Sequence, residues 1–432
     1  MKRALSSVLA LSVGMSMFAG CAAQDTKETL PQVDMGIADV RLEKEIRDIS
    51  TEEESDYRSS YLKFSFDLLN RCLAQDGQDA NVMVSPASVM LALDMTAAGA
   101  AGDTLTQITG LYMSDGADPQ GQISYASQLM RRLNSSGGVS LHAADSMWVN
   151  ENVIPEGLSP EFVSFVHDSF DAGSESLAFD GSALDRINGW VDDNTDGMIP
   201  TILDRLDPDI AMILINAIAF DGAWADQYED SQIAEGEFTS SSGQIQTVQM
   251  MSRDEDIYLE NDLATGFVKY YEGGEYAFVV MLPKDEDQSA GEMLSLFDGG
   301  MFEEYLASAS SDYIVHTELP EFSYDWGRSI KEQLISLGME VPFTSSADLS
   351  GIADLGAENL YIGDVVHKTH IEVNRSGTRA AAATAVITYR NAVIIQAEET
   401  REVICDRPFA YAIVDMTNNT PVFIGTVNQV ET

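Results

Sequence analysis

The sequence predicts one large α+β domain, and three observations support that fold class. Apolar residues first recur at helical spacing, over residues 59–74 and again over residues 85–98. Strand-like apolar runs dominate the chain after that point. No internal repeat or low-complexity region divides this span, and hydrophobic residues make up 45% of the 432 residues, which suffices for a large core. Helical and strand patterns within one span are typical of an α+β domain.

The individual elements follow in chain order. In the second helix Ser85 precedes Pro86, an arrangement that helix starts favour. Two later stretches also have helical spacing, residues 184–193 and residues 329–337. The predicted strands are the apolar runs at residues 212–218, 277–282, 313–319 and 411–415.

Residues 1–21 have the features of an export signal. A basic start is followed by an apolar stretch, residues 5–18, that is too short to cross a membrane as a helix. Small residues then lead to Cys21, as in a bacterial lipoprotein signal, which would make this cysteine the lipidated N-terminus. The alternative is an ordinary secretory signal cleaved near Ala22 or Ala23. Both alternatives predict an extracellular protein, either lipid-anchored at the cell surface or released.

The charge balance and the tether limit the possible partners. Asp and Glu number 70 against 24 Lys and Arg, a formal net charge of −46. Such a surface repels nucleic acid and anionic lipid, so we expect no nucleic-acid partner and membrane contact only through the N-terminal anchor. Residues 22–56 are polar and acidic and are predicted to form a tether, with the folded domain at residues 57–432.

Cys72 and Cys405 are expected to be buried and free, with a single disulfide as the alternative.

Separate blocks of residues resemble the serpin family, in order, over nearly everything after Ser59. No single block is specific, whereas the ordered set is. The blocks include Asn81-x-x-x-Ser85-Pro86-x-Ser88, Ile187-Asn188-x-Trp190-Val191, Asn216-Ala217-Ile218-x-Phe220-x-Gly222-x-Trp224, Leu319-Pro320-x-Phe322, Ala347-Asp348-Leu349-Ser350-Gly351 and Arg407-Pro408-Phe409. The resemblance implies a serpin fold with about nine helices, three β-sheets and an exposed reactive-centre loop at about residues 375–402.

A low-bulk segment corresponds to the hinge of that loop. It contains no proline, and its alternate side chains from Thr378 to Val386 are small and uncharged. Because side chains alternate across a strand, this set can face a core while Arg379 faces the opposite, solvated side. Serpins usually carry acids at Arg379 and near Arg375, so this chain reverses those charges. A plain helix or linker is the alternative for the alanine run. The hinge residues are Gly377, Thr378, Arg379, Ala380, Ala381, Ala382, Ala383 and Thr384.

Five further positions match conformational residues of the family. Four of them resemble the cluster beneath the point where the central sheet parts: Ser85, Ser88, Asn216 and His367. Hydroxyl, amide and imidazole groups can exchange hydrogen bonds as strands separate. Trp224 resembles the tryptophan where the loop first enters the sheet. Ordinary polar core packing is the alternative for these five residues.

The resemblance implies that the loop is bait for an extracellular serine protease. Family spacing places the cleaved bond at Asn391-Ala392, and a register one residue shorter gives Arg390-Asn391. Arg390 would suit a trypsin-like protease, because the pocket of such enzymes holds a carboxylate. Flanking residues are also compatible with elastase- or subtilisin-like enzymes. We expect a monomer that forms a covalent 1:1 complex with its target.

The sequence offers no catalytic apparatus of its own. The GxSxG and HExxH motifs are absent. His367 and His370 lie three residues apart in a predicted strand, which places them on opposite faces, so we expect no metal site and no cofactor. The chain is therefore expected to be a protease inhibitor and not an enzyme. The alternative is a serpin without inhibitory activity that acts as a binding or carrier protein.

Overall fold

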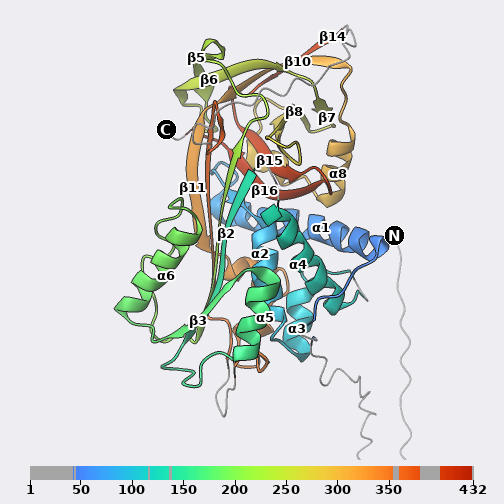
Figure 1. Ribbon diagram of the computed structural model, residues 1–432. Coiled ribbons are helices and arrows are strands. Elements are labelled where there is room, and N and C mark those ends of the chain that lie inside the picture. The colour runs from blue at the N-terminus through green and yellow to red at the C-terminus, as the bar shows by residue number, and fades with distance from the viewer. Residues whose placement is uncertain are drawn as a thin grey trace, which may run out of the picture. The chain divides into compact units, whose positions relative to one another are not determined.

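The computed structural model describes residue 42 and residues 45–114, 117–135, 139–353, 360–379 and 399–430. Nine α-helices occur in this part of the chain (Figure 1). They are α1 (Thr51–Asp76), α2 (Pro86–Ala97), α3 (Gly102–Thr109), α4 (Pro119–Ser135), α5 (Pro160–Phe170), α6 (Gly181–Asn194), α7 (Ala290–Leu294), α8 (Gly299–Ala307) and α9 (Lys331–Ser336).

The strands of the described residues form three sheets. The central sheet has the order β11-β12-β13-β4-β2-β3, the second sheet β1-β16-β15-β9-β8-β7, and the third sheet β14-β10-β6-β5. The strands are β1 (Met83–Val84), β2 (Val139–Asn150), β3 (Gly173–Leu177), β4 (Met212–Ala223), β5 (Ile233–Thr239), β6 (Ile245–Glu255), β7 (Tyr258–Glu260), β8 (Ala264–Tyr270), β9 (Tyr276–Pro283), β10 (Tyr313–Pro320), β11 (Phe322–Ser329), β12 (Asp364–Asn374), β13 (Gly377–Thr378), β14 (Glu399–Ile404), β15 (Phe409–Asp415) and β16 (Thr420–Val427).

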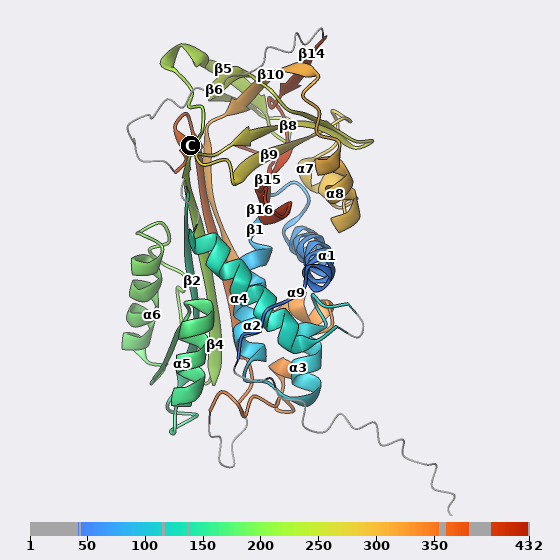
Figure 2. The same cartoon turned by 45° about the vertical axis from the view of Figure 1, so that its right-hand side comes forward.

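Helices cover both faces of the central sheet. In Figures 1 and 2, α6 lies on one face, and α2, α4 and α5 lie on the other. Ile187 and Val191 of α6 pack with Ala144 and Trp148 of β2 in a small separate core. The opposite face contributes to the main core, into which α2 is completely buried. A strand that is covered on both faces needs apolar side chains on both, which explains why β4 is a continuous apolar run.

Local signals explain where the helices begin. At α2, Ser85 accepts a hydrogen bond from the backbone N–H of Ser88, and Pro86 occupies the first turn. At α1, Ser50 and Glu53 form a capping box, so the helix starts at Thr51. The acidic residues 52–56, which the sequence assigned to the tether, form the first turns of this helix. The acids suit that place, since the N-terminal turn of a helix favours negative charge.

The predicted helices and strands are otherwise present at the expected positions, with ends shifted by a few residues in most cases. Cys72 and Cys405 are both buried and free, as expected. Burial raises the pKa of the Cys72 thiol to about 12 and that of the Cys405 thiol further still, so both are inert structural residues. Within the described ranges, none of the helices has the length and apolar character needed to span a membrane.

Candidate functional site

The start of the predicted loop already lies inside the central sheet. The two residues of β13 pair antiparallel with β12 on one side and with β4 on the other. Beyond β13, the two flanking strands pair directly with each other in parallel, from the pair Asp364 and Ile213 to the pair His370 and Ala219. A strand inserted further would have to separate this β12–β4 ladder. We call the position of β13 between β12 and β4 the entrance, and the direct pairing of β12 with β4 below it the seam. The entrance is occupied, and the seam is closed.

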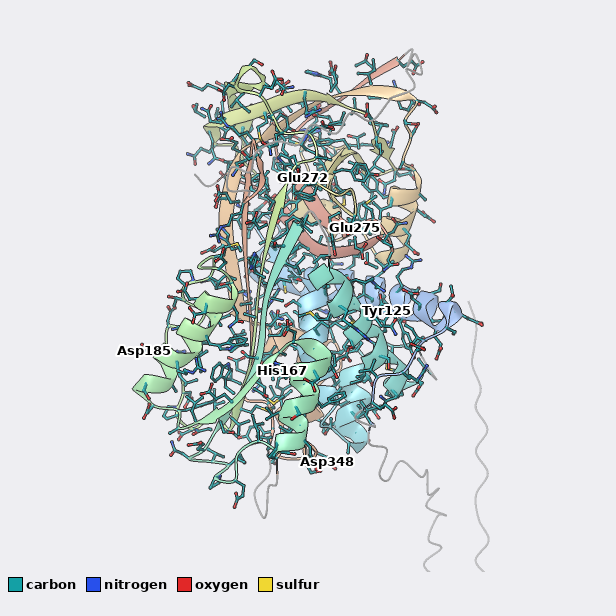
Figure 3. All side chains as sticks on the ribbon, viewed as in Figure 1. Tyr125, His167, Asp185, Glu272, Glu275 and Asp348 are labelled. Carbon is teal, nitrogen blue, oxygen red and sulfur yellow. The ribbon has the colours of Figure 1, made fainter. Side chains whose placement is uncertain are left out.

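Thr378 faces inward at this entrance. Its side chain is fully buried, and its hydroxyl lies 2.6 Å from the hydroxyl of Tyr271. Tyr271 stacks on Trp224 with the ring centroids 4.6 Å apart. A hydroxyl pair and an aromatic stack therefore line the inner side of the entrance. Nearby, Glu272, labelled in Figure 3, donates its backbone N–H to the carbonyl of Ala223 at the end of β4.

Trp224 also fixes the turn that precedes β13. Its indole N–H donates to the carbonyl of Asn374 at 2.9 Å, and its backbone N–H donates to the carbonyl of Ser376 at 3.0 Å. The backbone N–H of Tyr228 donates to the carbonyl of Arg375, also at 3.0 Å. The segment after β4 thus binds three successive carbonyl groups of the turn.

The two reversed charges of the hinge both have partners. Arg375 forms ion pairs with Glu321, at 3.3 Å, and with Asp230, at 2.8 Å. Arg379 donates its backbone N–H to the carbonyl of Glu372 and its guanidinium to the carbonyl of Asp196, just after α6. Arg379 therefore points to the face opposite Thr378. Its φ of 44° is unfavourable for a residue with a side chain, so the extended strand ends at Thr378.

The four residues predicted beneath the seam lie together and are completely buried. The backbone N–H of Ser85 donates to Nε2 of His367 at 3.0 Å. Nε2 therefore carries no proton, and the neutral ring carries its proton on Nδ1, which faces the carbonyl of Asn216 at 3.4 Å. Burial lowers the pKa of His367 to about 4. The amide of Asn216 donates to the hydroxyl of Ser88, which completes the cluster.

Sequence reasoning missed a fifth member of this cluster, Asp145 of β2. Its Oδ1 accepts hydrogen bonds from the hydroxyl of Ser88, at 3.1 Å, and from the amide of Asn216. Burial raises the pKa of Asp145 to about 7, and the two hydrogen bonds oppose that rise. The available signal was a single acidic residue inside a strand, between Ala144 and Ser146. We call these five residues the seam cluster: Ser85, Ser88, Asp145, Asn216 and His367.

A buried lysine near the entrance was also missed. Lys269 of β8 is almost fully buried, and its Nζ lies 2.7 Å from Glu255 and 4.3 Å from the ring centre of Tyr228. It also faces the ring of Trp224 at 5.4 Å. Burial lowers the pKa of Lys269 to about 8, because a charged ammonium is poorly solvated there. One lysine between Val268 and Tyr270 was the only sequence signal.

His370 does not share a site with His367. It lies on the other face of β12, and its Nδ1 is 2.6 Å from Asp325. The hydrogen bond with His370 lowers the pKa of Asp325. The remaining predicted site residues lie outside the described residues: Cys21, Ala380, Ala381, Ala382, Ala383, Thr384, Arg390, Asn391 and Ala392.

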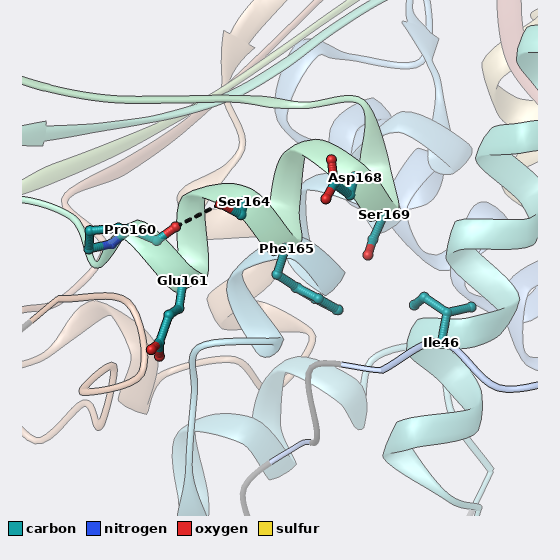
Figure 4. A pocket seen from close by; sticks show the side chains of 7 residues that line it. All are labelled: Ile46, Pro160, Glu161, Ser164, Phe165, Asp168 and Ser169. Carbon is teal, nitrogen blue, oxygen red and sulfur yellow. Dashed lines mark hydrogen bonds between the residues drawn. The ribbon is translucent and has the colours of Figure 1, made fainter.

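A surface hollow of about 710 Å³ lies beside α5, and none of the residues that line it belongs to the seam cluster (Figure 4). Its carboxylates, Glu161 and Asp168, face solvent, and no histidine or cysteine accompanies them in the lining. Ser164, one of the two serines in the lining, donates its hydroxyl to the backbone carbonyl of Pro160 and not to a carboxylate. The residues that line the hollow are Ile46, Pro160, Glu161, Ser164, Phe165, Asp168 and Ser169.

Comparisons with known proteins agree with this geometry. A family model described as Serpin (serine protease inhibitor) matches residues 59–430. The chain is 31% identical over 397 residues to Iris from Ixodes ricinus, covering 87% of this chain and 100% of Iris. It is 29% identical over 388 residues to the leukocyte elastase inhibitor of Bos taurus, covering 85% of this chain and 97% of that protein.

Solved structures show the same fold. The thermophilic serpin tengpin in its native state is 34% identical, with a TM-score of 0.79, and the match covers 90% of this chain and 98% of tengpin. Tengpin in its latent state gives a lower TM-score of 0.73. Human thyroxine-binding globulin, solved in complex with thyroxine, gives a TM-score of 0.78 at 21% identity over 88% of this chain and all of that chain, a likeness of fold alone.

Proposed function

The chain belongs to the serpin family, and we propose that it inhibits an extracellular serine protease as a suicide substrate. One observation carries this proposal. The start of the loop occupies the top of the central sheet as β13, with an inward side chain that is small and uncharged, while the seam below it is closed by direct pairing of β12 with β4. After cleavage the rest of the loop can extend β13 along the sheet if β12 and β4 separate to admit it.

The proposed reaction starts as ordinary proteolysis. The serine hydroxyl of the protease attacks the carbonyl of the bait bond, its proton passes to the leaving amine, and an ester joins the loop to the enzyme. Water would normally hydrolyse this ester. We propose that the cleaved loop instead inserts between β12 and β4 and carries the protease with it. Because a displacement of about 1 Å in an active site can lower the rate about a hundredfold, the distorted protease no longer completes deacylation.

The small residues at the hinge allow insertion to be faster than hydrolysis of the ester. Each residue added between two strands gains backbone hydrogen bonds worth about 0.5–1.5 kcal/mol net, provided that its inward side chain fits. Thr378 meets that condition, since it is fully buried and its hydroxyl is paired with Tyr271. Arg379 carries its charge on the side of α6, where it already has an acceptor in Asp196. The reversed charge at this position is therefore compatible with insertion.

The target class depends on the bond that is cut. Cleavage at Asn391-Ala392 favours a protease of broad specificity, and cleavage at Arg390-Asn391 favours a trypsin-like one. Mass spectrometry of the released C-terminal peptide distinguishes the two bonds, since the peptide masses differ by one asparagine.

Incubation with trypsin, elastase and subtilisin, followed by denaturing electrophoresis, tests the inhibitory function. We expect the inhibitor to be a monomer and to form a covalent 1:1 complex with at least one of these enzymes. This complex should survive detergent and heat. Clean cleavage of the chain with full retention of protease activity would contradict the proposal. That outcome would favour a serpin that binds or carries a ligand without inhibiting.

We also propose that the protein acts outside the cell, anchored through lipid on Cys21. The support is the export signal in residues 1–21, with its apolar stretch and terminal cysteine. Labelling cells with a radioactive fatty acid tests the anchor: the wild-type chain should incorporate the label, and the Cys21→Ser variant should not. Labelling of neither protein, with the chain found in the medium, would indicate an ordinary secretory signal.

A further inference from the structure

Asp145 is the one acidic side chain in the seam cluster, and only half of its carboxyl group is hydrogen bonded. Oδ1 accepts from Ser88 and Asn216, whereas Oδ2 is fully buried and has no partner among the described residues. The amide oxygen of Asn216 is likewise buried without a partner there. A buried carboxylate oxygen without a donor costs more free energy than the same group in its neutral, protonated form.

The seam cluster connects α2 to both halves of the central sheet. Ser88 of α2 bonds Asp145 of β2, whose neighbour β4 supplies Asn216. Ser85, the residue that caps the start of α2, donates its backbone N–H to His367 of β12, on the other side of the seam. Separation of β12 from β4 must therefore move at least one half of the sheet relative to α2, and it disturbs the contacts of Asp145 or those of His367.

We propose that Asp145 is a positioning residue that makes the seam sensitive to pH. The protonated form keeps the seam closed, and the ionised form favours the separation of β12 from β4. This inference rests on the proposed function, because it concerns the same insertion step. It predicts an inhibitor that is held in its closed form under acidic conditions and becomes competent as the pH approaches neutrality.

The sign follows from proton linkage. Burial raises the pKa of Asp145 to about 7 in the closed sheet, and an opened, hydrated carboxyl group has a lower pKa. The closed sheet therefore holds its proton more tightly than the open one. The free energy of opening falls as the pH rises from about 4 to about 7 and is constant above that range.

The other titratable groups near Asp145 do not account for such an effect. His367 acts in the opposite sense: its pKa is lowered to about 4 in the closed sheet, so exposure of its ring would favour opening as the pH falls and cannot produce a rise in opening with pH. On α2 the charged residue is Asp94, which bonds Tyr112 and Gln122. The charged residues of α4 lie near its end, where Arg131 bonds a backbone carbonyl of its own helix and Arg132 pairs with Glu54. By strand alternation His142 of β2, Asp221 of β4, and Lys368 and His370 of β12 lie on the α6 side.

The test compares wild-type protein with Asp145→Asn, which keeps the shape of the side chain but cannot ionise. Asp94→Asn is the matched control, because Asp94 is equally buried and its pKa is also raised to about 7, but its partners lie outside the seam cluster. Hydrogen exchange of those β12 amides between Asp364 and His370 that bond β4, and not β11, reports opening of the seam. Rates are divided by the intrinsic chemical exchange rate at each pH.

Between about pH 5 and about pH 8 we expect the corrected opening of wild-type protein to rise at least about tenfold, the equivalent of one pKa unit. The corrected opening of Asp94→Asn should rise in the same way, whereas that of Asp145→Asn should not change with pH. Each of three results would overturn the proposal: the opening of the wild type does not change with pH, the pH dependence of the wild type persists in Asp145→Asn, or it is lost in Asp94→Asn. This readout needs no protease, so it remains decisive if no covalent complex forms.

A second measurement links the seam to inhibition. From about pH 6 to about pH 8, the number of inhibitor molecules consumed per protease molecule should be lowered by rising pH more for the wild type than for Asp145→Asn. This ratio reflects the competition between insertion and hydrolysis, and the pH dependence of hydrolysis by the protease is common to both proteins. Equal pH profiles for the two proteins would contradict a role of Asp145 in insertion.

Discussion

Replacement of Thr378 by arginine is the sharpest perturbation of the hinge. The side chain of Thr378 is fully buried, and its neighbourhood is crowded. On the paired residue Gly222, an added Cβ would lie within 3.0 Å of Phe220, Val139 and Tyr271. An arginine side chain cannot fit there without displacing β13, and burial of its charge without a partner costs at least several kcal/mol.

The free-energy cost of burying the arginine charge can be compared with the hydrogen bonds that hold β13 in the sheet. Its two residues pair with both neighbouring strands, a gain of about 0.5–1.5 kcal/mol for each hydrogen bond. The cost of the buried charge exceeds this gain, so we expect Thr378→Arg to expel β13. An increase of about 3 kcal/mol in the activation free energy of insertion would slow insertion roughly a hundredfold, because each 1.4 kcal/mol corresponds to a factor of ten.

The assay is a titration of protease with inhibitor. Wild-type protein should need close to one molecule per enzyme, and Thr378→Arg should be cleaved as a substrate and leave the enzyme active. Thr378→Val is the matched control: it keeps the shape but leaves the Tyr271 hydroxyl unpaired, which costs about 1–3 kcal/mol of stability without placing a charge in the sheet. Unchanged inhibition by Thr378→Arg would refute the reasoning.

Two further substitutions examine groups around the entrance. Since its folded-state pKa is lowered to about 8, Lys269 destabilises the protein at neutral pH, and stability should rise between about pH 8 and about pH 10.5 by up to about 3 kcal/mol. Chemical unfolding of Lys269→Met should lack this rise, and an identical pH profile for both proteins would contradict the assignment. Arg375→Glu should lose about 1 kcal/mol of unfolding free energy through repulsion by Glu321 and Asp230, a modest value because Arg375 is 40% exposed. The double variant Arg375→Glu, Glu321→Arg should recover part of that loss, and failure of the second change to improve stability would argue against a direct pair.

Much of this architecture could be predicted from the sequence, because apolar periodicity reports which faces of an element are buried. The pattern located α2, β4 and β9, and the ordered blocks of residues identified the fold. The start of α1 was misplaced, since its acidic first turn has the composition of a solvated tether. Only the capping box of Ser50 and Glu53 marks the true beginning.

Site residues were predictable where a motif carried them and not where burial alone creates their chemistry. Ser85, Asn216 and His367 lie in recognisable blocks, and the structure brings them together. Asp145 and Lys269 are single polar residues in strands, and a sequence gives no distance from them to a partner or to solvent. Their shifted pKa values arise from desolvation, which only the packed fold determines.

The central claim is that the loop can enter the central sheet between β12 and β4 after it is cut. The most direct test cleaves the loop with a protease that is not inhibited and compares thermal unfolding before and after. A new strand beside the seven residue pairs from Asp364 to His370 adds on the order of 4–10 kcal/mol in hydrogen bonds. The account predicts a rise in unfolding temperature on the order of 10 °C after cleavage. An unchanged or lower unfolding temperature would contradict it.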